Sequence, residues 1–314
     1  MKKITKYFLI TITIFIVTGV IVSLFFVRSI FRSLTEKENN FSPIITRFLE
    51  KINSRPVTPV VVTNPEETIR IIEGWTSRDI GQYFEKDGRF LTTEFLAVVG
   101  SPRVDYREKS AAQAPKDFTA EFSFLNDKSS YYGLEGYLFP DTYRIYASST
   151  VSDVVEKMLS NFDKKLTAKM RADIKSQGKT IYEIVTLASI VEKEAPIDYQ
   201  NGDDRDARII AGIFLNRLRI GQGLQSDATL SYIFGDNKPA HSGAELDSPS
   251  PYNTYKYRGL PPGPICNPGS LALEAAIYPI MTDYNYFLTP KGKSEVIYAR
   301  TYEEHLQNKY KYLK

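Results

Sequence analysis

The sequence contains few of the side chains that most often bind metals or serve in nucleophilic catalysis. Among its 314 residues there is one cysteine, Cys266, and there are two histidines, His241 and His305. This scarcity leaves few ligands for zinc and few bases for a serine or cysteine nucleophile. A single cysteine also excludes a disulfide within the chain. We therefore assign these three side chains to the surface or to packing, and we predict neither a metal nor an organic cofactor.

The chain also lacks a strong excess of charge of either sign. It has 40 Lys and Arg residues against 37 Asp and Glu, a net charge of +3, and no long basic block interrupts this balance. Proteins that bind nucleic acid usually show a clear basic excess, so nucleic acid is not predicted as a partner. The composition, 42% hydrophobic and 25% charged, is typical of a globular protein with one large domain or two modest ones.

One long apolar run lies near the N-terminus. It begins at Phe8, ends at Val27 and carries no charge, and lysines precede it while arginines follow it. A helix of about 20 residues is long enough to span the hydrocarbon of a bilayer. The bulky residues at the end of the run do not fit a cleavage site, so the run predicts an uncleaved anchor in the lipid bilayer. Positive charge is nearly balanced across it, which favours a cytoplasmic N-terminus only weakly.

Composition along the chain predicts three consecutive parts. Residues 1–28 form a cytoplasmic tip and transmembrane anchor, and residues 29–66 form a membrane-proximal linker in which prolines restrict helix. Residues 67–314 form a folded domain of the α+β class. Within it, residues 67–147 are predicted to be a small α+β part and residues 148–314 a mainly helical part.

Periodicity predicts the main elements of this domain. Helices are expected at 76–84, 151–164, 180–195, 206–220 and 270–276, a strand at 67–72, and a hairpin of strands at 284–288 and 296–299.

The helix predicted at 180–195 ends in two carboxylates. A T-x-x-E capping box opens this helix, and Pro196 disfavours its continuation, so Glu192 and Glu194 lie in the last turn. There they face the partial negative charge of unpaired carbonyls, which should raise their pKa. A raised pKa suits a general acid. A solvated helix end is the simpler interpretation of this feature alone, and both interpretations stay open at this point.

Several sequence blocks occur in an order typical of one family. They are IEGW at 72–75, EGYLFPDTY at 135–143, LASIVEKE at 187–194, IFLNRLRIG at 213–221, LQSDATL at 224–230, SPYNTY at 250–255 and GLPPGP at 259–264. From about residue 68 to its C-terminus, the chain resembles the YceG-like family, the MltG endolytic lytic transglycosylases of peptidoglycan (murein). Several blocks in register are far more specific than any one of them.

The resemblance implies a single-pass inner-membrane enzyme with its catalytic domain outside the cytoplasm and a helical lysozyme-like core. The family's essential glutamate matches Glu194. The implied reaction cleaves bonds between N-acetylmuramic acid and N-acetylglucosamine within peptidoglycan glycan strands, without water, and leaves 1,6-anhydro ends. Such an enzyme would limit or terminate the elongation of nascent strands beside the cell-wall synthesis machinery. Many members carry a LysM-like segment, for which residues 29–65 are too short and too rich in proline.

A second group of residues is predicted to surround the sugar. Amide, hydroxyl and aromatic groups together hold a pyranose ring through hydrogen bonds and stacking. This favours five residues in the matched blocks: Gln225, Asp227, Tyr252, Asn253 and Tyr255. Simpler roles stay open, because Ser226 or Asp227 could cap a helix that begins near Ala228, and Asn253 could be a turn residue.

Other polar residues and other functions compete with this interpretation. Glu192 is the nearest competitor for the catalytic role, and Glu135 and Asp141 are candidates for lining the cleft. Arg217 and Arg219 are expected to pair with carboxylates of the protein. The alternative functions are a lysozyme-like hydrolase, which would use water and leave reducing ends, and an inactive peptidoglycan-binding scaffold.

Overall fold

The computed structural model describes residues 64–107, 109, 113–129, 132–236, 238, 241–290 and 295–313. Asn64–Lys314 forms one compact unit. The predicted anchor at residues 8–27 and nearly all of the predicted linker lie outside the described residues. Within the described ranges, no helix combines the length and the apolar character needed to cross a membrane. The predicted boundaries of tip, linker and domain stay predictions.

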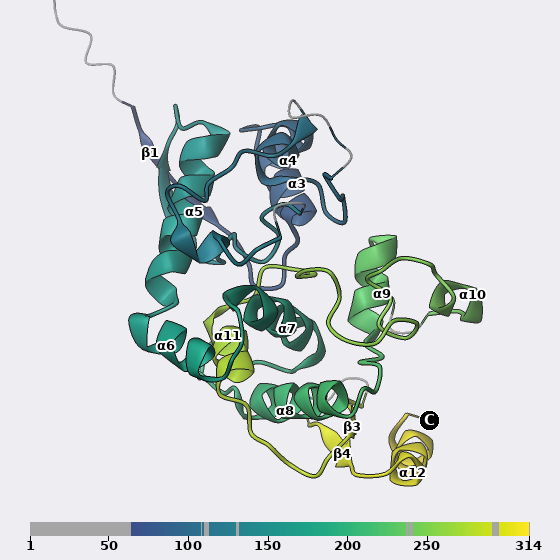
Figure 1. Cartoon of the computed structure of the whole chain (residues 1–314). Helices are drawn as coiled ribbons and strands as arrows, with labels where there is room; N and C mark the ends of the chain where they lie inside the picture. The colour runs from purple at the N-terminus through teal and green to yellow at the C-terminus, as the bar shows by residue number, and fades with distance from the viewer. Residues whose placement is uncertain are drawn as a thin grey trace, which may run out of the picture. The chain divides into compact units, whose positions relative to one another are not determined.

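Helices predominate among the described residues, and two small sheets accompany them, so the mixed α+β class is confirmed (Figure 1). The helices are α3 Ser77–Lys86, α4 Thr92–Val99, α5 Val151–Lys165, α6 Ala168–Ser176, α7 Ile181–Glu194, α8 Arg205–Arg219, α9 Asp227–Phe234, α10 Gly243–Leu246, α11 Ser270–Ile277 and α12 Tyr302–Tyr312, with a short 3-10 helix at Ser123–Leu125. The strands are β1 Glu66–Arg70, β2 Thr142–Tyr146, β3 Tyr286–Leu288 and β4 Ile297–Ala299.

Both sheets are antiparallel pairs. Strand β1 pairs with β2 so that Glu66 lies opposite Tyr146, and every second residue of β2 is buried. Strands β3 and β4 form the hairpin that the sequence predicts, with Tyr286 opposite Ala299. Because side chains alternate across a strand, the β1–β2 pair buries one face and leaves the other polar.

Three of the longer helices begin at threonine capping boxes. In each box the threonine hydroxyl accepts from the backbone of the third helical residue, whose carboxylate accepts from the threonine N–H. The pairs are Thr76 with Asp79, Thr150 with Asp153, and Thr180 with Glu183. The box at Thr180 confirms the predicted start of α7. Ala195, the residue before Pro196, has extended dihedrals and confirms its predicted end.

Helix α7 lies among other helices rather than on the surface. It packs against α8, α9 and α11, which surround it in Figure 1. Residues 184–191 are all buried, as expected for a helix enclosed on all sides. The fold therefore fixes the path of α7 firmly, and with it the place where Glu194 emerges from the core.

Helix α8 carries a glycine where another part of the chain comes very close. A Cβ on Gly212 would lie 2.2 Å from the Ile280 carbonyl oxygen, and the Ile280 N–H donates to the Arg208 carbonyl at 2.9 Å. The segment after α11 thus docks on α8 through backbone atoms. These atoms cannot move aside as a flexible side chain can.

We predict that Gly212→Ala lowers the free energy of unfolding by about 1–3 kcal/mol, because the added methyl group overpacks this contact. Gly243→Ala is the matched control, since a Cβ there would meet nothing within 4 Å. Its effect should stay within about 1 kcal/mol. Urea denaturation of the two variants checks this, and equal effects would show that the close approach at Gly212 does not matter.

Candidate functional site

The last turn of α7 directs Glu194 against the start of α9. The Ser226 hydroxyl donates to Glu194 Oε1 at 2.5 Å, and the Ala228 backbone N–H lies 3.4 Å from the same oxygen. Glu194 as a whole residue is partly exposed, but its carboxyl is enclosed by protein atoms. One carboxyl thus stands where the C-terminus of one helix meets the N-terminus of another.

The pKa of Glu194 is raised above the ordinary carboxyl value. Burial is the main cause, because it penalises the charged form, and the negative charge of Asp227 adds to it. Hydrogen bonds from Ser226 and Ala228 and the positive charge of Arg217 act in the opposite direction. The direction agrees with the expectation from the sequence, but that expectation rested on helix-end carbonyls, whereas burial dominates. The carboxyl is suited to holding a proton.

Ser226 is fixed by its surroundings rather than free to turn. Its backbone N–H donates to Thr254 Oγ1 at 3.1 Å, and its carbonyl accepts from Thr229 Oγ1 at 2.8 Å. Both threonines are buried. Ser226 occupies the N-cap position of α9 but makes no side-chain capping bond. The capping role considered for its side chain is therefore wrong, because the hydroxyl turns to Glu194 instead.

Gln225, the residue before Ser226, has an unusual backbone conformation. Its φ is +51°, in the left-handed region that costs energy for a residue with a side chain. Its N–H donates to the Thr254 carbonyl at 3.2 Å, which holds this conformation in place. The side chain of Gln225 is exposed beside the site.

Asp227 and Tyr255 form a polar pair next to Glu194. The Tyr255 hydroxyl donates to Asp227 Oδ1 at 2.9 Å, and the charges of both Asp227 and Glu194 raise the pKa of Tyr255, although burial is the larger cause. Asp227 is the first residue of α9, so its carboxylate also faces the positive end of that helix. The structure thus brings Asp227 and Tyr255 close to the carboxyl, and Gln225 precedes Ser226 in the chain.

Arg217 lies behind this group, and its bonding differs from the prediction. The guanidinium donates to the Asn285 carbonyl at 3.0 and 2.9 Å and also to the Leu224 carbonyl. Neither Arg217 nor Arg219 forms an ion pair with a carboxylate among the described residues, so that prediction is wrong. Because Arg217 donates to neutral carbonyls, its positive charge is not cancelled by a carboxylate. This charge therefore acts on Glu194 and lowers its pKa.

Tyr252 and Asn253 are buried, unlike the other predicted sugar-binding residues. The Asn253 amide donates to the carbonyls of Leu246 and Ser248 at 2.8 and 2.9 Å, and its oxygen accepts from the Tyr255 N–H at 3.0 Å. The Asn253 amide group is therefore engaged inside its loop, where it sets the position of Tyr255. Tyr252 is 3% exposed and packs against a neighbouring tyrosine ring.

Two other predicted candidates take part in structural contacts. Glu192 Oε2 accepts from the Tyr199 hydroxyl at 2.5 Å and from the Gly269 N–H at 3.0 Å, which ties two loops to α7. Asp141 accepts from Asn161 Nδ2 at 2.9 Å and pairs with Lys165 at 3.6 Å, both on helix α5.

A second buried carboxyl belongs to Glu135, which is 8% exposed. Its Oε1 accepts from the Ser77 N–H at 2.8 Å, the Ser77 hydroxyl at 3.1 Å and Asn267 Nδ2 at 3.1 Å. Its Oε2 lies 3.5 Å from the Tyr232 hydroxyl. Burial raises the pKa of Glu135 to about 8. The sequence marks this residue through its matched block but gives no sign of how deeply it is buried.

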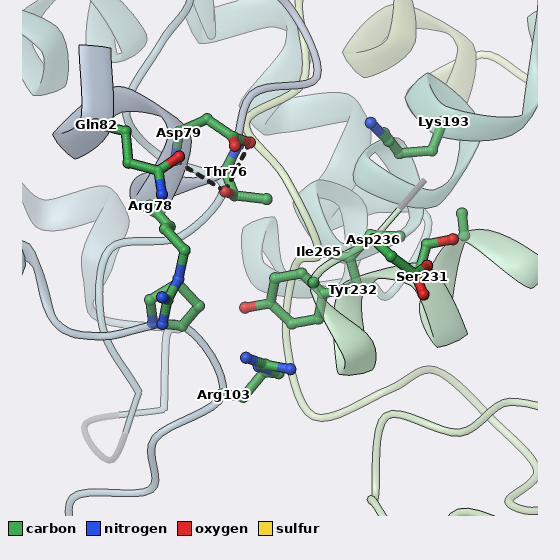
Figure 2. Close-up of a pocket in the computed structure, with 13 residues that line it drawn as sticks. Thr76, Arg78, Asp79, Gln82, Arg103, Lys193, Ser231, Tyr232, Asp236 and Ile265 are labelled. Carbon is green, nitrogen blue, oxygen red and sulfur yellow. Dashed lines mark hydrogen bonds between the residues drawn. The ribbon is translucent and has the colours of Figure 1, made fainter. Parts of the chain in front are cut away.

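A pocket of about 160 Å³ lies between α3, α9 and the last turn of α7 (Figure 2). Its lining residues include Lys193, which precedes Glu194, and Ala228, whose N–H faces the Glu194 carboxyl. Helix α3 and the loop after α4 form the opposite wall, with Arg78 and Arg103. Glu194 itself does not line the pocket, which approaches its carboxyl through the neighbouring residues Lys193 and Ala228.

One cluster of the described residues has the composition of a metal site. Ligand atoms of Asp236, His241 and Glu245 lie within 4.8 Å of one another. However, Lys238 Nζ lies 2.6 Å from Glu245 Oε1 and 3.2 Å from Asp236 Oδ2. This ammonium already provides the positive charge between the two carboxylates, so the cluster gives no reason to place a metal there.

The fold and the site together define a mixed α+β protein in which Glu194, an enclosed glutamate with a raised pKa, lies near a polar pocket. A model of the YceG-like family matches residues 28–311 of the chain, which therefore belongs to this family. The sequence resemblance to that family is confirmed.

Relatives and a solved structure agree with this assignment. The chain is 36% identical over 263 residues to the endolytic murein transglycosylase of Streptococcus pneumoniae strain R6, covering 81% of this chain and 45% of that one. It is 37% identical over 256 residues to the Bacillus subtilis protein of the same name, covering 77% and 69%. A crystal structure of a YceG-like protein from Listeria monocytogenes matches with a TM-score of 0.62 and 31% identity, covering 78% and 76%. The chain thus spans less than half the length of the pneumococcal relative.

The raised pKa of Glu135 makes stability depend on pH. The unfolded chain has a Glu135 pKa near 4.5 and the folded chain about 8, so between these values only the folded state keeps the proton. The stability that this proton provides to the folded state is fully present below about pH 4.5 and is lost as the pH rises to about 8. We predict that wild type loses up to about 1.4 kcal/mol per pH unit in this window relative to Glu135→Gln, which mimics the protonated form.

Chemical denaturation at several pH values measures this difference. Glu121→Gln, at an exposed glutamate, is the control and should follow wild type. Parallel pH curves for wild type and Glu135→Gln would contradict a protonated Glu135.

Proposed function

We propose that this chain is a peptidoglycan lytic transglycosylase that cuts glycan strands internally, with Glu194 as catalytic acid and base. Its substrate would be the bond between N-acetylmuramic acid and N-acetylglucosamine, and its product a 1,6-anhydro-muramyl end. The name endolytic murein transglycosylase, carried by relatives at 36–37% identity, supports the substrate and the reaction class.

One observation carries the proposal: an enclosed carboxyl with a raised pKa next to an open pocket. Protonation of a leaving glycosidic oxygen requires an acid that keeps its proton near neutral pH. Burial raises the pKa of Glu194 and so favours the protonated form, and the pocket lined by its neighbours Lys193 and Ala228 would admit part of a sugar strand.

The proposed reaction needs one carboxyl and no water. Glu194 donates its proton to the leaving oxygen as the bond from the muramyl anomeric carbon breaks. The muramyl 6-hydroxyl then bonds to that carbon and returns its proton to Glu194. The negative charge of Asp227, near enough to disfavour ionisation of Glu194, would also favour the positive charge that develops on the sugar ring.

The ionised carboxylate between these steps is also accommodated. Ser226 donates a hydrogen bond and the α9 N-terminus offers the Ala228 N–H to the same oxygen. Because both donors favour the charged form, they prevent burial from making proton release too costly.

In this proposal α7, α8, α9 and α11 serve as a lysozyme-like helical core that presents the glutamate. Gln225, Asp227 and Tyr255 contact the sugar, while Tyr252 and Asn253 support the loop that carries Tyr255. The apolar run at residues 8–27 anchors the chain in the cell membrane with its N-terminus in the cytoplasm, and residues 67–314 act outside. There the enzyme limits or terminates elongation of nascent strands beside the synthesis machinery.

We predict that Glu194→Gln lowers strand cleavage by about 10²–10⁴-fold, the range of a general acid–base residue. Glu192→Gln should lower it by less than about tenfold, because its contacts with Tyr199 and Gly269 are structural. Purified full chain in detergent is incubated with uncrosslinked glycan strands, and products are measured by mass spectrometry.

The products distinguish the alternatives. Anhydro ends formed within strands support a lytic transglycosylase, whereas reducing ends alone would identify a hydrolase. Binding to strands without any cleavage, with no effect of Glu194→Gln, would identify a scaffold.

Ser226→Ala tests how Glu194 holds its proton. Removing the hydroxyl takes away a hydrogen bond that favours the ionised form, so the pKa of Glu194 should rise further. The decline of kcat/KM at alkaline pH, where the acid is lost, should then move to higher pH. Ser176→Ala, at an exposed serine on α6, should leave the profile in place. A Ser226→Ala profile that moves to lower pH, or does not move, would contradict the proposed contact.

A further inference from the structure

The pocket near Glu194 contains three positive charges that no carboxylate of the described residues pairs with. Arg78 comes from α3, Arg103 from the loop after α4, and Lys193 from the last turn of α7. Neither guanidinium group forms a hydrogen bond or an ion pair with the described residues, and Lys193 Nζ approaches the Gly74 carbonyl only at 3.5 Å. These cations are therefore available to a ligand.

The acidic residues of the same pocket are already engaged. Asp79 Oδ2 accepts from the Thr76 N–H and the Thr76 hydroxyl, both at 2.8 Å, as the dashed lines in Figure 2 show. Asp236 pairs with Lys238 at 3.2 Å. Because Lys238 balances Asp236, the three cationic side chains of the pocket outnumber the remaining carboxylate, Asp79, and the pocket favours an anion.

Arg103 is half-buried in the pocket wall, whereas Arg78 and Lys193 are exposed and accessible to a ligand. Figure 2 shows the Arg103 guanidinium group facing the Tyr232 ring and the Arg78 side chain extending from α3 along the side of the pocket. Arg103 Cζ lies 5.8 Å from the centroid of the Tyr232 ring, and the backbone of Arg103 has a φ of +65°. The contact with this ring limits where the Arg103 guanidinium group can lie.

The two walls of the pocket are also joined beneath it. Tyr232 on α9 contacts Glu135 at 3.5 Å, and Glu135 accepts from the Ser77 N–H at the start of α3 at 2.8 Å. This link fixes the distance between the wall that carries Arg78 and the helix that begins beside Glu194. The pocket is thus preorganised before any ligand binds.

We propose that this pocket binds a carboxylate of the stem peptide on the muramyl residue whose glycosidic bond Glu194 cleaves. This inference rests on the proposed function. The peptide leaves the muramyl ring through its lactyl group, close to the anomeric carbon, and it carries free carboxylates. Two guanidinium groups match a planar carboxylate through paired hydrogen bonds, which a neutral sugar would not need. The chain would therefore prefer strands that carry peptides over bare glycan.

The test compares two substrates on the full chain in detergent. One is peptide-bearing glycan strands, and the other is the same strands after an amidase has removed the peptides. Wild type should show a kcat/KM at least about tenfold higher on the peptide-bearing strands, as expected from one or more charge-assisted hydrogen bonds. The Arg78→Gln/Arg103→Gln variant should lose most of this preference.

Arg144→Gln is the matched control, because Arg144 is an exposed arginine on β2 outside the pocket. It should keep the wild-type preference. Equal cleavage of both substrates by wild type, or a preference that survives in the double variant, would overturn the subsite while leaving the proposed function intact.

Direct binding separates the subsite from catalysis. Calorimetry would compare an N-acetylmuramyl peptide with its methyl ester, neither of which has a bond to cleave. Wild type should bind the free acid at least about tenfold more tightly than the ester, and the double variant should not. Equal binding of acid and ester would overturn a carboxylate subsite. So would a titration in which inorganic phosphate, at the same concentration as the peptide, displaces the acid and the ester equally well. The binding result is valid even if the chain cleaves no strand. A failure to cleave would refute the proposed function, not the subsite.

Discussion

The hydrogen bond between Ser226 and Glu194 joins the end of α7 to the start of α9, and the chemistry of the site depends on it. It holds the carboxyl inside the protein, where burial raises its pKa, and it gives the same carboxyl a partner when the proton leaves. Burial alone would make ionisation too costly, and hydrogen bonds alone would keep the group charged. In the function we propose, the balance of the two would let Glu194 act as both acid and base.

This arrangement requires support from several parts of the chain. Thr254 and Thr229 fix Ser226, Asn253 fixes the loop that carries Tyr255, and the enclosed position of α7 fixes Glu194. A carboxylate at a helix C-terminus is unfavourable for stability, as is a left-handed backbone at Gln225. Such features are most often kept where a fixed geometry serves a function.

The sequence predicts the elements better than it predicts the contacts between them. Local rules place the start of α7 at Thr180 and its end before Pro196, because capping and proline geometry act within a few residues. The family resemblance points to Glu194 and to the loops around it. Local patterns cannot show that Ser226 turns away from capping, that Arg217 binds carbonyls, or that Asn253 lies inside its loop. These depend on partners about 7 to 70 positions away in the chain. The cationic pocket could not be predicted from the sequence either, because Arg78, Arg103 and Lys193 come together only in the folded chain.

The central claim is that Glu194 keeps its proton at a pH where ordinary glutamates have lost it. A carbon-13 NMR titration of glutamate side-chain carboxyls, with Glu194→Gln used to assign the signal, measures this directly. We expect the Glu194 signal to titrate above the ordinary carboxyl pKa, since burial is its main influence. A signal that titrates at or below that value would contradict a proton-holding glutamate at the centre of the site.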